Sequence, residues 1–142
     1  MTSSLSDFLT AQNSGNPSNF DIAFQELSSG QKTSHWIWFI LPQLKSLGRS
    51  ETAIYYGIEN LDHAKLYLQH EILGQRLEAV VNLISPQIFV NNIELEALMG
   101  SPIDAFKTIS SLTLFEQAGL ESASKILSKT GRCEKTLLQI VN

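Results

Sequence analysis

The stretch KTSHWIWFILPQL, from Lys32 to Leu44, is the least ordinary part of the sequence and decides how the chain is expected to fold. Read as a helix that begins after a Ser34 cap, it carries apolar side chains on every side. A helix of this kind in a soluble domain is surrounded by other helices. We therefore expect a buried central helix that Pro42 ends or kinks, because the residue before a proline resists helical geometry.

Most of the remaining chain has apolar residues three and four positions apart, a spacing typical of amphipathic helices. Helices are expected at residues 4–12, 20–29, 51–58, 63–69, 72–85, 94–99, 104–119, 121–129 and 134–141. The segment 87–92 is expected to be a loop that follows Pro86. No internal repeat or long linker divides the chain. The pattern predicts an all-α, single-domain multihelical bundle spanning residues 1–142, with about seven to nine helices and frayed ends at 1–5 and 141–142.

Composition argues against several classes of protein. The 142 residues suit one domain, and 43% of them are hydrophobic. A net charge of −4 without any run of Lys or Arg disfavours nucleic-acid binding. No apolar run approaches the roughly 20 residues of a spanning helix, and the N-terminus lacks a signal-peptide pattern. We therefore expect a cytoplasmic protein with no membrane partner.

Metal and cofactor motifs are absent from the sequence. Cys133 is the only cysteine and cannot form an internal disulfide, and no group of Cys and His has the spacing of a zinc site. The sequence also lacks a P-loop, a Gly-rich dinucleotide turn and a nucleophile elbow. No metal is expected, and no cofactor is indicated.

The histidine and tryptophans of the opening stretch form the first candidate site. Indole rings stack on planar ligands and imidazole titrates near neutral pH, so Trp36 or Trp38 is a candidate stacking residue and His35 a candidate proton carrier. Gln43 lies roughly 12 Å from His35 along a regular helix. It is expected to touch the far end of a larger ligand, with Lys32 assisting. The alternative is a core segment whose polar atoms have ordinary hydrogen-bond partners.

A polar stripe on the segment DAFKTISSLT, residues 104–113, is the second candidate site. At helical spacing the stripe combines a cation with hydroxyl groups, a set suited to a phosphate or a carboxylate. It contains Lys107, Ser110, Ser111 and Thr113, while Phe106, Ile109, Leu112 and Phe115 are expected to form the buried face. The structural alternative is a surface pair of Lys107 with Asp104, with the hydroxyls bonded to helix carbonyls.

Two other positions are weaker candidates. Arg49 stands beside an expected helix N-terminus, where free N–H groups favour an anion. A plain turn capped by Ser50 explains the same residues. His70, at the end of an expected helix, is better explained by capping or packing than by chemistry.

Five strings and Lys107 resemble a bacterial family catalogued as domain of unknown function 1810, over roughly residues 6–139. They are SHWIWFILPQ, LGRS, AKLYLQHEILGQRL, GSPID and SSLTLF. The His-Trp-x-Trp-Phe-x-x-Pro-Gln order is the most specific of them. The resemblance implies a multihelical fold with buried central helices and no established activity. Ile37 and Leu112 stand where methionine is common in the family, and Cys133 stands where an acidic residue is expected.

These observations favour a cytosolic domain that binds a small anionic ligand with a planar ring, such as a nucleotide or an ADP-ribose derivative. Lys107, Ser110 and Ser111 would hold the anion, and any reaction would be hydrolysis or transfer at a glycosidic or phosphate bond. The alternative is a non-catalytic protein-interaction or regulatory domain, with an unidentified protein partner and a structural His-Trp-x-Trp-Phe motif. Only the ligand hypothesis requires Lys107 and a residue of the opening stretch to face one cleft.

Overall fold

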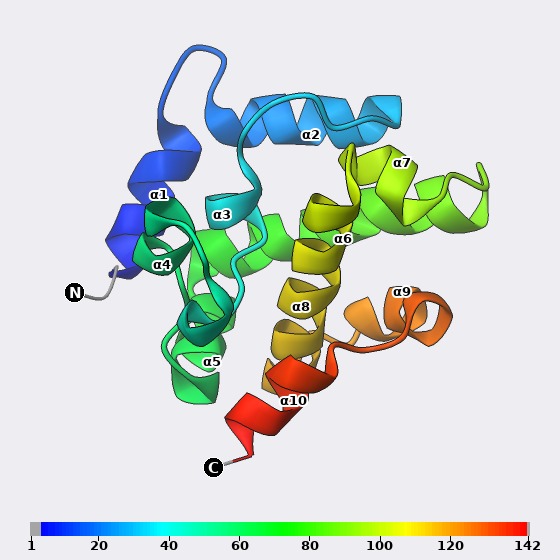
Figure 1. Ribbon diagram of the computed structural model, residues 1–142. Coiled ribbons are helices and arrows are strands. Elements are labelled where there is room, and N and C mark those ends of the chain that lie inside the picture. The colour runs from blue at the N-terminus through cyan, green and yellow to red at the C-terminus, as the bar shows by residue number, and fades with distance from the viewer. Residues whose placement is uncertain (1–3, 142) are drawn as a thin grey trace.

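The computed structural model describes residues 4–141, in which ten α-helices and one 3-10 turn form the fold and no β-strand occurs (Figure 1). The all-α class is confirmed, and the number of helices is one above the upper end of the expected range. The elements are α1 (Leu5–Asn13), α2 (Asn19–Ser29), α3 (Ile37–Ile40), η1 (Lys45–Leu47), α4 (Glu51–Tyr55), α5 (Leu61–Gln69), α6 (Glu71–Phe89), α7 (Leu95–Met99), α8 (Pro102–Ala118), α9 (Ala123–Thr130) and α10 (Glu134–Ile140). Residues 1–3 and 142, where fraying was expected, lie outside the described range, whereas Leu5 is already helical.

Side chains that satisfy free backbone N–H groups define several helix starts. Ser50 accepts a hydrogen bond from the Ala53 N–H and Asn60 from the His63 N–H, and Ser101 does the same at the start of α8. Helix α4 begins at Glu51 as expected, whereas α5 and α8 begin at Leu61 and Pro102, two residues before the expected positions. Helix α2 is capped by Ser18, and Asn19 is its first helical residue.

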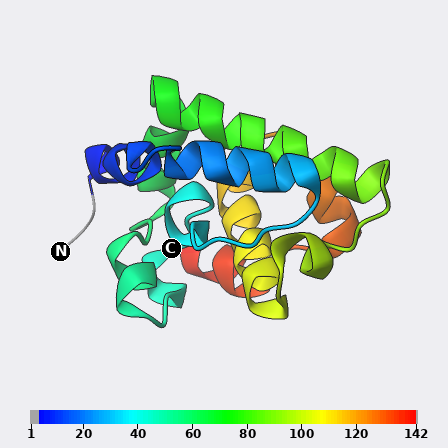
Figure 2. The ribbon, with the colours of Figure 1, turned by 90° about the horizontal axis from the view of Figure 1, so that it is seen from above.

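Helices α6 and α8 form the centre of the molecule. The apolar side of α8 packs against α3, α5, α7, α9 and α10, while α6 lies against α2 and α5 (Figures 1 and 2). The prediction that Pro86 ends α6 is wrong, because the helix continues to Phe89. The side chain of Gln87 stabilises this last turn by donating to the carbonyls of Leu27 and Ser28 at 2.8 and 3.0 Å.

The opening stretch is buried, as predicted, but it is mostly not a helix. Only residues 37–40 are helical, and the chain leaves the helix at Leu41 with a φ of −128°. Leu44 instead forms an isolated parallel bridge with Ile58. The backbone N–H of Ile58 donates to the carbonyl of Gln43 at 2.9 Å, and that of Lys45 to the carbonyl of Ile58 at 2.8 Å. Long-range partners thus replace the helical hydrogen bonds that Pro42 prevents.

A buried polar network joins the first helix to this irregular segment. The amide nitrogen of Gln12 donates to the carbonyl of Phe39 at 2.8 Å and to the hydroxyl of Tyr67 at 3.1 Å. Its amide oxygen accepts from Arg76 at 3.1 Å. Complete burial raises the pKa of Tyr67, so its hydroxyl stays protonated. The network therefore fixes the positions of α1, α3, α5 and α6 relative to one another.

The junction between α5 and α6 depends on a close backbone approach at Gly74. His70 caps α6 through Nδ1, which accepts from the N–H groups of Ile72 and Leu73 at 3.2 Å each. A Cβ atom on Gly74 would lie 2.0 Å from the carbonyl oxygen of Leu68. Because that atom belongs to the backbone, the two helices would have to separate.

We expect Gly74→Ala to lower the free energy of unfolding by about 3 kcal/mol, as for severe overpacking. The matched control is Gly131→Ala, where a Cβ would meet no atom within 4 Å and only a φ of +83° opposes the substitution. That control should lose about 1 kcal/mol. Urea unfolding of both variants measures the difference, and equal losses would contradict the steric explanation.

Candidate functional site

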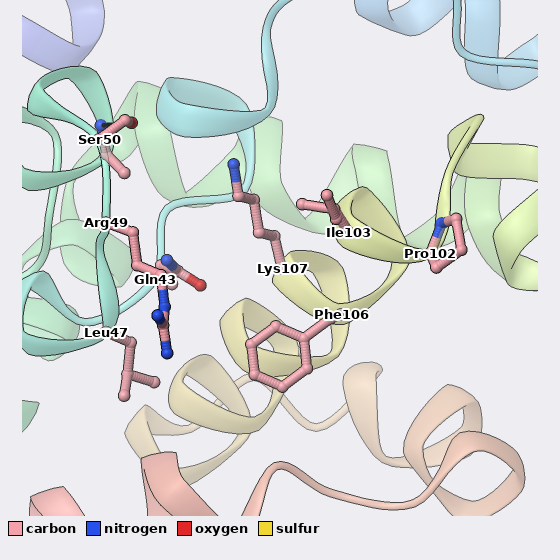
Figure 3. A pocket seen from close by; sticks show the side chains of 9 residues that line it. Gln43, Leu47, Arg49, Ser50, Pro102, Ile103, Phe106 and Lys107 are labelled. Carbon is pink, nitrogen blue, oxygen red and sulfur yellow. Dashed lines mark hydrogen bonds between the residues drawn. The ribbon is translucent and has the colours of Figure 1, made fainter.

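A cleft of about 510 Å³ separates the segment around α4 from the N-terminal half of α8. Its walls are mainly apolar, with polar groups at only a few positions, a composition typical of small-molecule sites. The residues that line it are Gln43, Leu47, Arg49, Ser50, Ala53, Pro102, Ile103, Phe106 and Lys107 (Figure 3).

The sequence builds the α8 wall of the cleft at the start of that helix. Pro102 occupies its first turn after the Ser101 cap, so the next turn presents Ile103, Phe106 and Lys107 on adjoining positions. Phe106 is 46% exposed and Ile103 is 67% exposed. The prediction that Phe106 belongs to the buried face of its helix is therefore wrong, because the side of α8 that bears Ile103 and Phe106 is left uncovered while α7 packs on another side.

The opposite wall comes from the turn before α4. Close packing of Gly48, where a Cβ would lie 3.0–3.2 Å from atoms of Ala53 and Ile54, folds the turn tightly onto the helix. Ser50 caps that helix, as the plain-turn explanation expected, and Arg49 is exposed beside it at the cleft. The same short sequence thus supplies both a cap and a cation.

Two cations on different elements face this cleft. Arg49 lies on one wall and Lys107 on the other, and no described carboxylate lies within ion-pair distance of either side chain. The Lys107 side chain extends toward the α3 segment, where Nζ is 5.8 Å from the centroid of the Trp38 ring (Figure 3). The Lys107 ammonium points toward α3 and the Arg49 guanidinium lies near Leu47, so the two charges lie at different places along the cleft (Figure 3).

A small chamber lies at the inner end of the cleft. It is lined by Ile37, Trp38, Leu41, Gln43, Ala53 and Lys107. Three of these residues, Gln43, Ala53 and Lys107, also line the main cleft, so the two spaces adjoin. Gln43 is only 8% exposed, and its Oε1 atom has no hydrogen-bond partner in the described structure. The buried Nε1 atom of Trp38 also lacks a partner there. Buried polar atoms without partners are rare in folded proteins and mark places where a ligand or water is bound.

Lys32 and Asp104 form an ion pair away from the cleft. The Lys32 Nζ atom lies 2.8 Å from the Asp104 carboxylate and donates to the Ser34 carbonyl at 2.7 Å. Asp104 is therefore the partner of Lys32, and the alternative in which it pairs with Lys107 is wrong. The ammonium group also lies 5.0 Å from the centroid of the Trp36 ring. Lys32 is thus held by the fold and does not line the cleft.

Trp36 is a core residue and not an exposed stacking surface. It is 1% exposed, and its Nε1 atom donates to the carboxylate of Glu26 at 2.9 Å. Glu26 also accepts from the backbone N–H groups of Thr33 and Ser34 at 2.9 and 3.0 Å, and from both hydroxyls. Partial burial raises the pKa of Glu26, but these hydrogen bonds outweigh it and lower the pKa to about 2.

His35 and Trp38 lie on the other side of the segment. Their rings stack with centroids 6.4 Å apart and an interplanar angle of 25°. His35 is exposed and Trp38 is half-buried, and only Trp38 reaches the inner chamber. His35 therefore supports the ring of Trp38 without lining the cleft.

The predicted hydroxyl stripe on α8 does not face the cleft. Ser110 shares a hydrogen bond of 3.0 Å with Thr136, and Thr113 donates to the Ile109 carbonyl at 2.7 Å while accepting from the Cys133 N–H at 3.0 Å. Ser111 is fully buried one turn after Lys107, and its Oγ atom has no described partner. The expectation of a free polar stripe is wrong because α9 and α10 cover this part of the helix.

The cleft thus unites Gln43 and Lys107, one residue from each predicted site, and Trp38 lies at its inner end. The sequence analysis missed Phe106, Ile103 and Leu47 and ranked Arg49 as a weak candidate. The apolar residues beside Lys107 could have indicated a cleft wall in the sequence. Their helical spacing, however, fits a buried helix face equally well.

No group of three or more His, Cys, Asp or Glu in residues 4–141 could hold a metal ion. Over the same residues, no helix has the length and apolar content needed to cross a membrane.

The hydrogen bonds to Glu26 predict how acid affects stability. The folded pKa of about 2 lies below the ordinary value of 4.5, so the carboxylate stabilises the fold fully above pH 4.5 and this contribution declines as pH falls toward 2. We expect Glu26→Gln to lose about 2 kcal/mol at neutral pH and to flatten the loss of stability between those pH values. Urea unfolding at several pH values measures both effects. Glu121→Gln, at an exposed position, is the control, and an unchanged acid profile in Glu26→Gln would contradict the assignment.

The two lysines of the candidate sites should differ in their effect on stability. Lys32→Ala leaves the Asp104 carboxylate without its partner and should cost about 2–3 kcal/mol. Lys107→Ala removes only a cation–π contact and should cost less than about 1 kcal/mol. Thermal or urea unfolding of both variants tests this, and a large loss in Lys107→Ala would make that residue a structural one.

The comparisons with known proteins agree with the resemblance seen in the sequence. The family model described as "Protein of unknown function (DUF1810)" matches residues 2–136. The crystal structure of the conserved hypothetical protein Rv1873 from Mycobacterium tuberculosis is similar, with 35% sequence identity and a TM-score of 0.86 over 97% of this chain and 96% of that chain. No curated protein matches the chain. The predicted resemblance and fold are confirmed, and the chain belongs to the DUF1810 family.

Proposed function

We propose that this protein binds a small anionic ligand with a planar ring, such as a nucleotide or an ADP-ribose derivative, in the cleft between α4 and α8. The observation that carries the proposal is the position of Arg49 and Lys107 on opposite walls of one apolar cleft, above the buried amide of Gln43. The cleft volume of about 510 Å³ is within the range of small-molecule sites.

The two cations suit the anionic part of such a ligand. A phosphate accepts hydrogen bonds on several oxygens, a guanidinium offers a planar set of N–H donors, and an ammonium offers a mobile point charge. Lys107 is half-buried beside apolar residues, which strengthens its attraction for an anion, whereas Arg49 is exposed and its charge is screened by solvent. We assign anion binding to this pair. Ser110, Ser111 and Thr113, the hydroxyl residues first considered for it, are buried in the helix packing.

The planar ring of the ligand is assigned to the apolar α8 wall. Phe106 is the exposed aromatic side chain that lines the cleft, and Ile103 and Leu47 extend the apolar surface. An aromatic ring in offset or edge contact with Phe106 gains dispersion and quadrupole energy beyond area burial. In this proposal Phe106 takes the stacking role first considered for the two tryptophans, and Trp38 contributes at the inner end.

His35 stacks on Trp38 without lining the cleft, so it can act as a proton carrier only for a ligand that extends past the Trp38 ring. The class to assay is hydrolysis or transfer at a glycosidic or phosphate bond, with His35 as the proton carrier. The protein-interaction alternative is less well supported. It requires His35, Trp36, Trp38 and Gln43 to be buried and satisfied with no cavity beside them. Trp36 meets this requirement, whereas His35 is exposed and Trp38 and Gln43 have unpartnered atoms beside a cleft.

A thermal-shift screen against nucleotides, sugar phosphates, NAD-related compounds and inorganic anions tests the proposal. A ligand present at about 100 times its Kd should stabilise the fold by roughly 2.7 kcal/mol and raise the Tm by about 3–6 °C. The shift should disappear in Lys107→Ala and Arg49→Ala. It should persist in Lys65→Ala, which changes an exposed lysine that does not line the cleft. A shift that survives removal of Lys107 and Arg49 together would refute the proposed anion site, and so would the absence of any shift.

A further inference from the structure

The inner chamber of the cleft has a polarity that restricts what can occupy it. Gln43 Oε1 accepts hydrogen bonds and Trp38 Nε1 donates one, and neither buried atom has a partner in the described structure. Both residues line the chamber, and Figure 3 shows the amide oxygen of Gln43 directed to the α8 side of the cleft. A single group that satisfied both atoms would have to be a donor and an acceptor at once.

The size of the chamber narrows the choice further. Its volume is about 10 Å³, which corresponds to one water-sized group. A carboxamide has both a donor and an acceptor, but on two separate heavy atoms, and so needs more space. The chamber is thus suited to a single polar atom with its hydrogen.

The polarity of Gln43 Oε1 opposes an anionic group in the chamber, and the Lys107 cation opposes a cationic one. A phosphate or carboxylate oxygen could accept from Trp38, but its lone pairs would oppose those of Gln43 Oε1. An ammonium group could donate to Gln43, but it would leave the Trp38 N–H unpaired and lie beside the Lys107 cation. An alcohol hydroxyl donates and accepts through one oxygen and carries no charge.

We propose that the ligand of this cleft carries an alcohol hydroxyl that enters the inner chamber, where it donates to Gln43 Oε1 and accepts from Trp38 Nε1–H. This inference rests on the proposed function and deepens it, because it adds a hydroxyl to the anion and the ring as a required feature. Gln43, Ala53 and Lys107 line both the chamber and the main cleft, so one molecule can occupy both spaces. Phosphorylated sugars and ribonucleotides are the class that combines these groups.

Matched pairs of compounds that differ only in their hydroxyls test this inference. The probes are AMP against 2′,3′-dideoxy-AMP, and glycerol 3-phosphate against propyl phosphate, each titrated calorimetrically into the full chain. A hydroxyl in the chamber replaces water that has the same hydrogen-bonding capacity, so only the net gain is measured. We expect the hydroxylated member of at least one pair to bind about tenfold more tightly, because its hydroxyl satisfies both atoms without immobilising a separate water molecule.

Two variants connect the preference to the chamber. Gln43→Met removes the acceptor at similar volume, and Trp38→Phe removes the donor. Neither substitution removes the backbone hydrogen bond that the Ile58 N–H donates to the Gln43 carbonyl. Both variants should bind the two members of a pair with nearly equal affinity, and the loss should come from weaker binding of the hydroxylated compound. The melting temperature of each variant shows whether it folds. If only one variant folds, that variant alone is used for the comparison.

Three results would overturn the inference in distinguishable ways. If both members of each pair bind equally and Lys107→Ala weakens both, the anion site stands and the hydroxyl assignment fails. If the hydroxyl preference survives in both Gln43→Met and Trp38→Phe, the hydroxyl is recognised outside the chamber. If no compound of the pairs or of the wider anion screen binds, the proposed function fails and this inference fails with it.

Discussion

Residues 32–45 cross the core mostly without helical hydrogen bonds, so their buried backbone groups need partners from distant parts of the chain. The Lys32 N–H donates to the Leu98 carbonyl at 2.7 Å, and the Phe39 carbonyl accepts from Gln12 at 2.8 Å. The bridge at Ile58 satisfies the groups around Leu44. These partners lie on α7, on α1 and in the loop between α4 and α5, so the irregular segment determines how the surrounding parts of the chain are placed.

Carboxylates are used in the same way at both ends of the structure. Glu26 gathers donors from the start of the irregular segment, and Glu116 accepts two hydrogen bonds from Arg132 at 2.6 and 2.7 Å and one from Ser124 at 2.7 Å. The pKa of Glu116 is lowered to about 2, mainly by the hydrogen bonds from Arg132. One charged acceptor with several donors ties a loop to a helix at each place. The two cleft cations, by contrast, have no carboxylate partner among the described residues.

The cleft is a consequence of the path taken by the irregular segment. Because the chain leaves the helix at Leu41, Gln43 is placed under the α4 turn instead of one helical turn farther along the core. The start of α8 then has no helix covering Ile103 and Phe106, and the gap between these two elements remains open. A continuous helix through Gln43 would have placed its side chain elsewhere. The same departure from regular structure that binds the core together therefore also exposes the candidate site.

The sequence by itself determined the helical class, most helix positions with their caps, the family and the burial of most of residues 36–44. These features follow from local periodicity, from side chains that bond nearby N–H groups, and from the apolar character of the segment. Only the tertiary structure decided that Lys32 pairs with Asp104, that Trp36 bonds Glu26, and that Gln43 and Lys107 share one cleft. Such outcomes depend on which elements cover each helix face and where a non-helical backbone finds its partners. Spacing along a single chain contains neither kind of information.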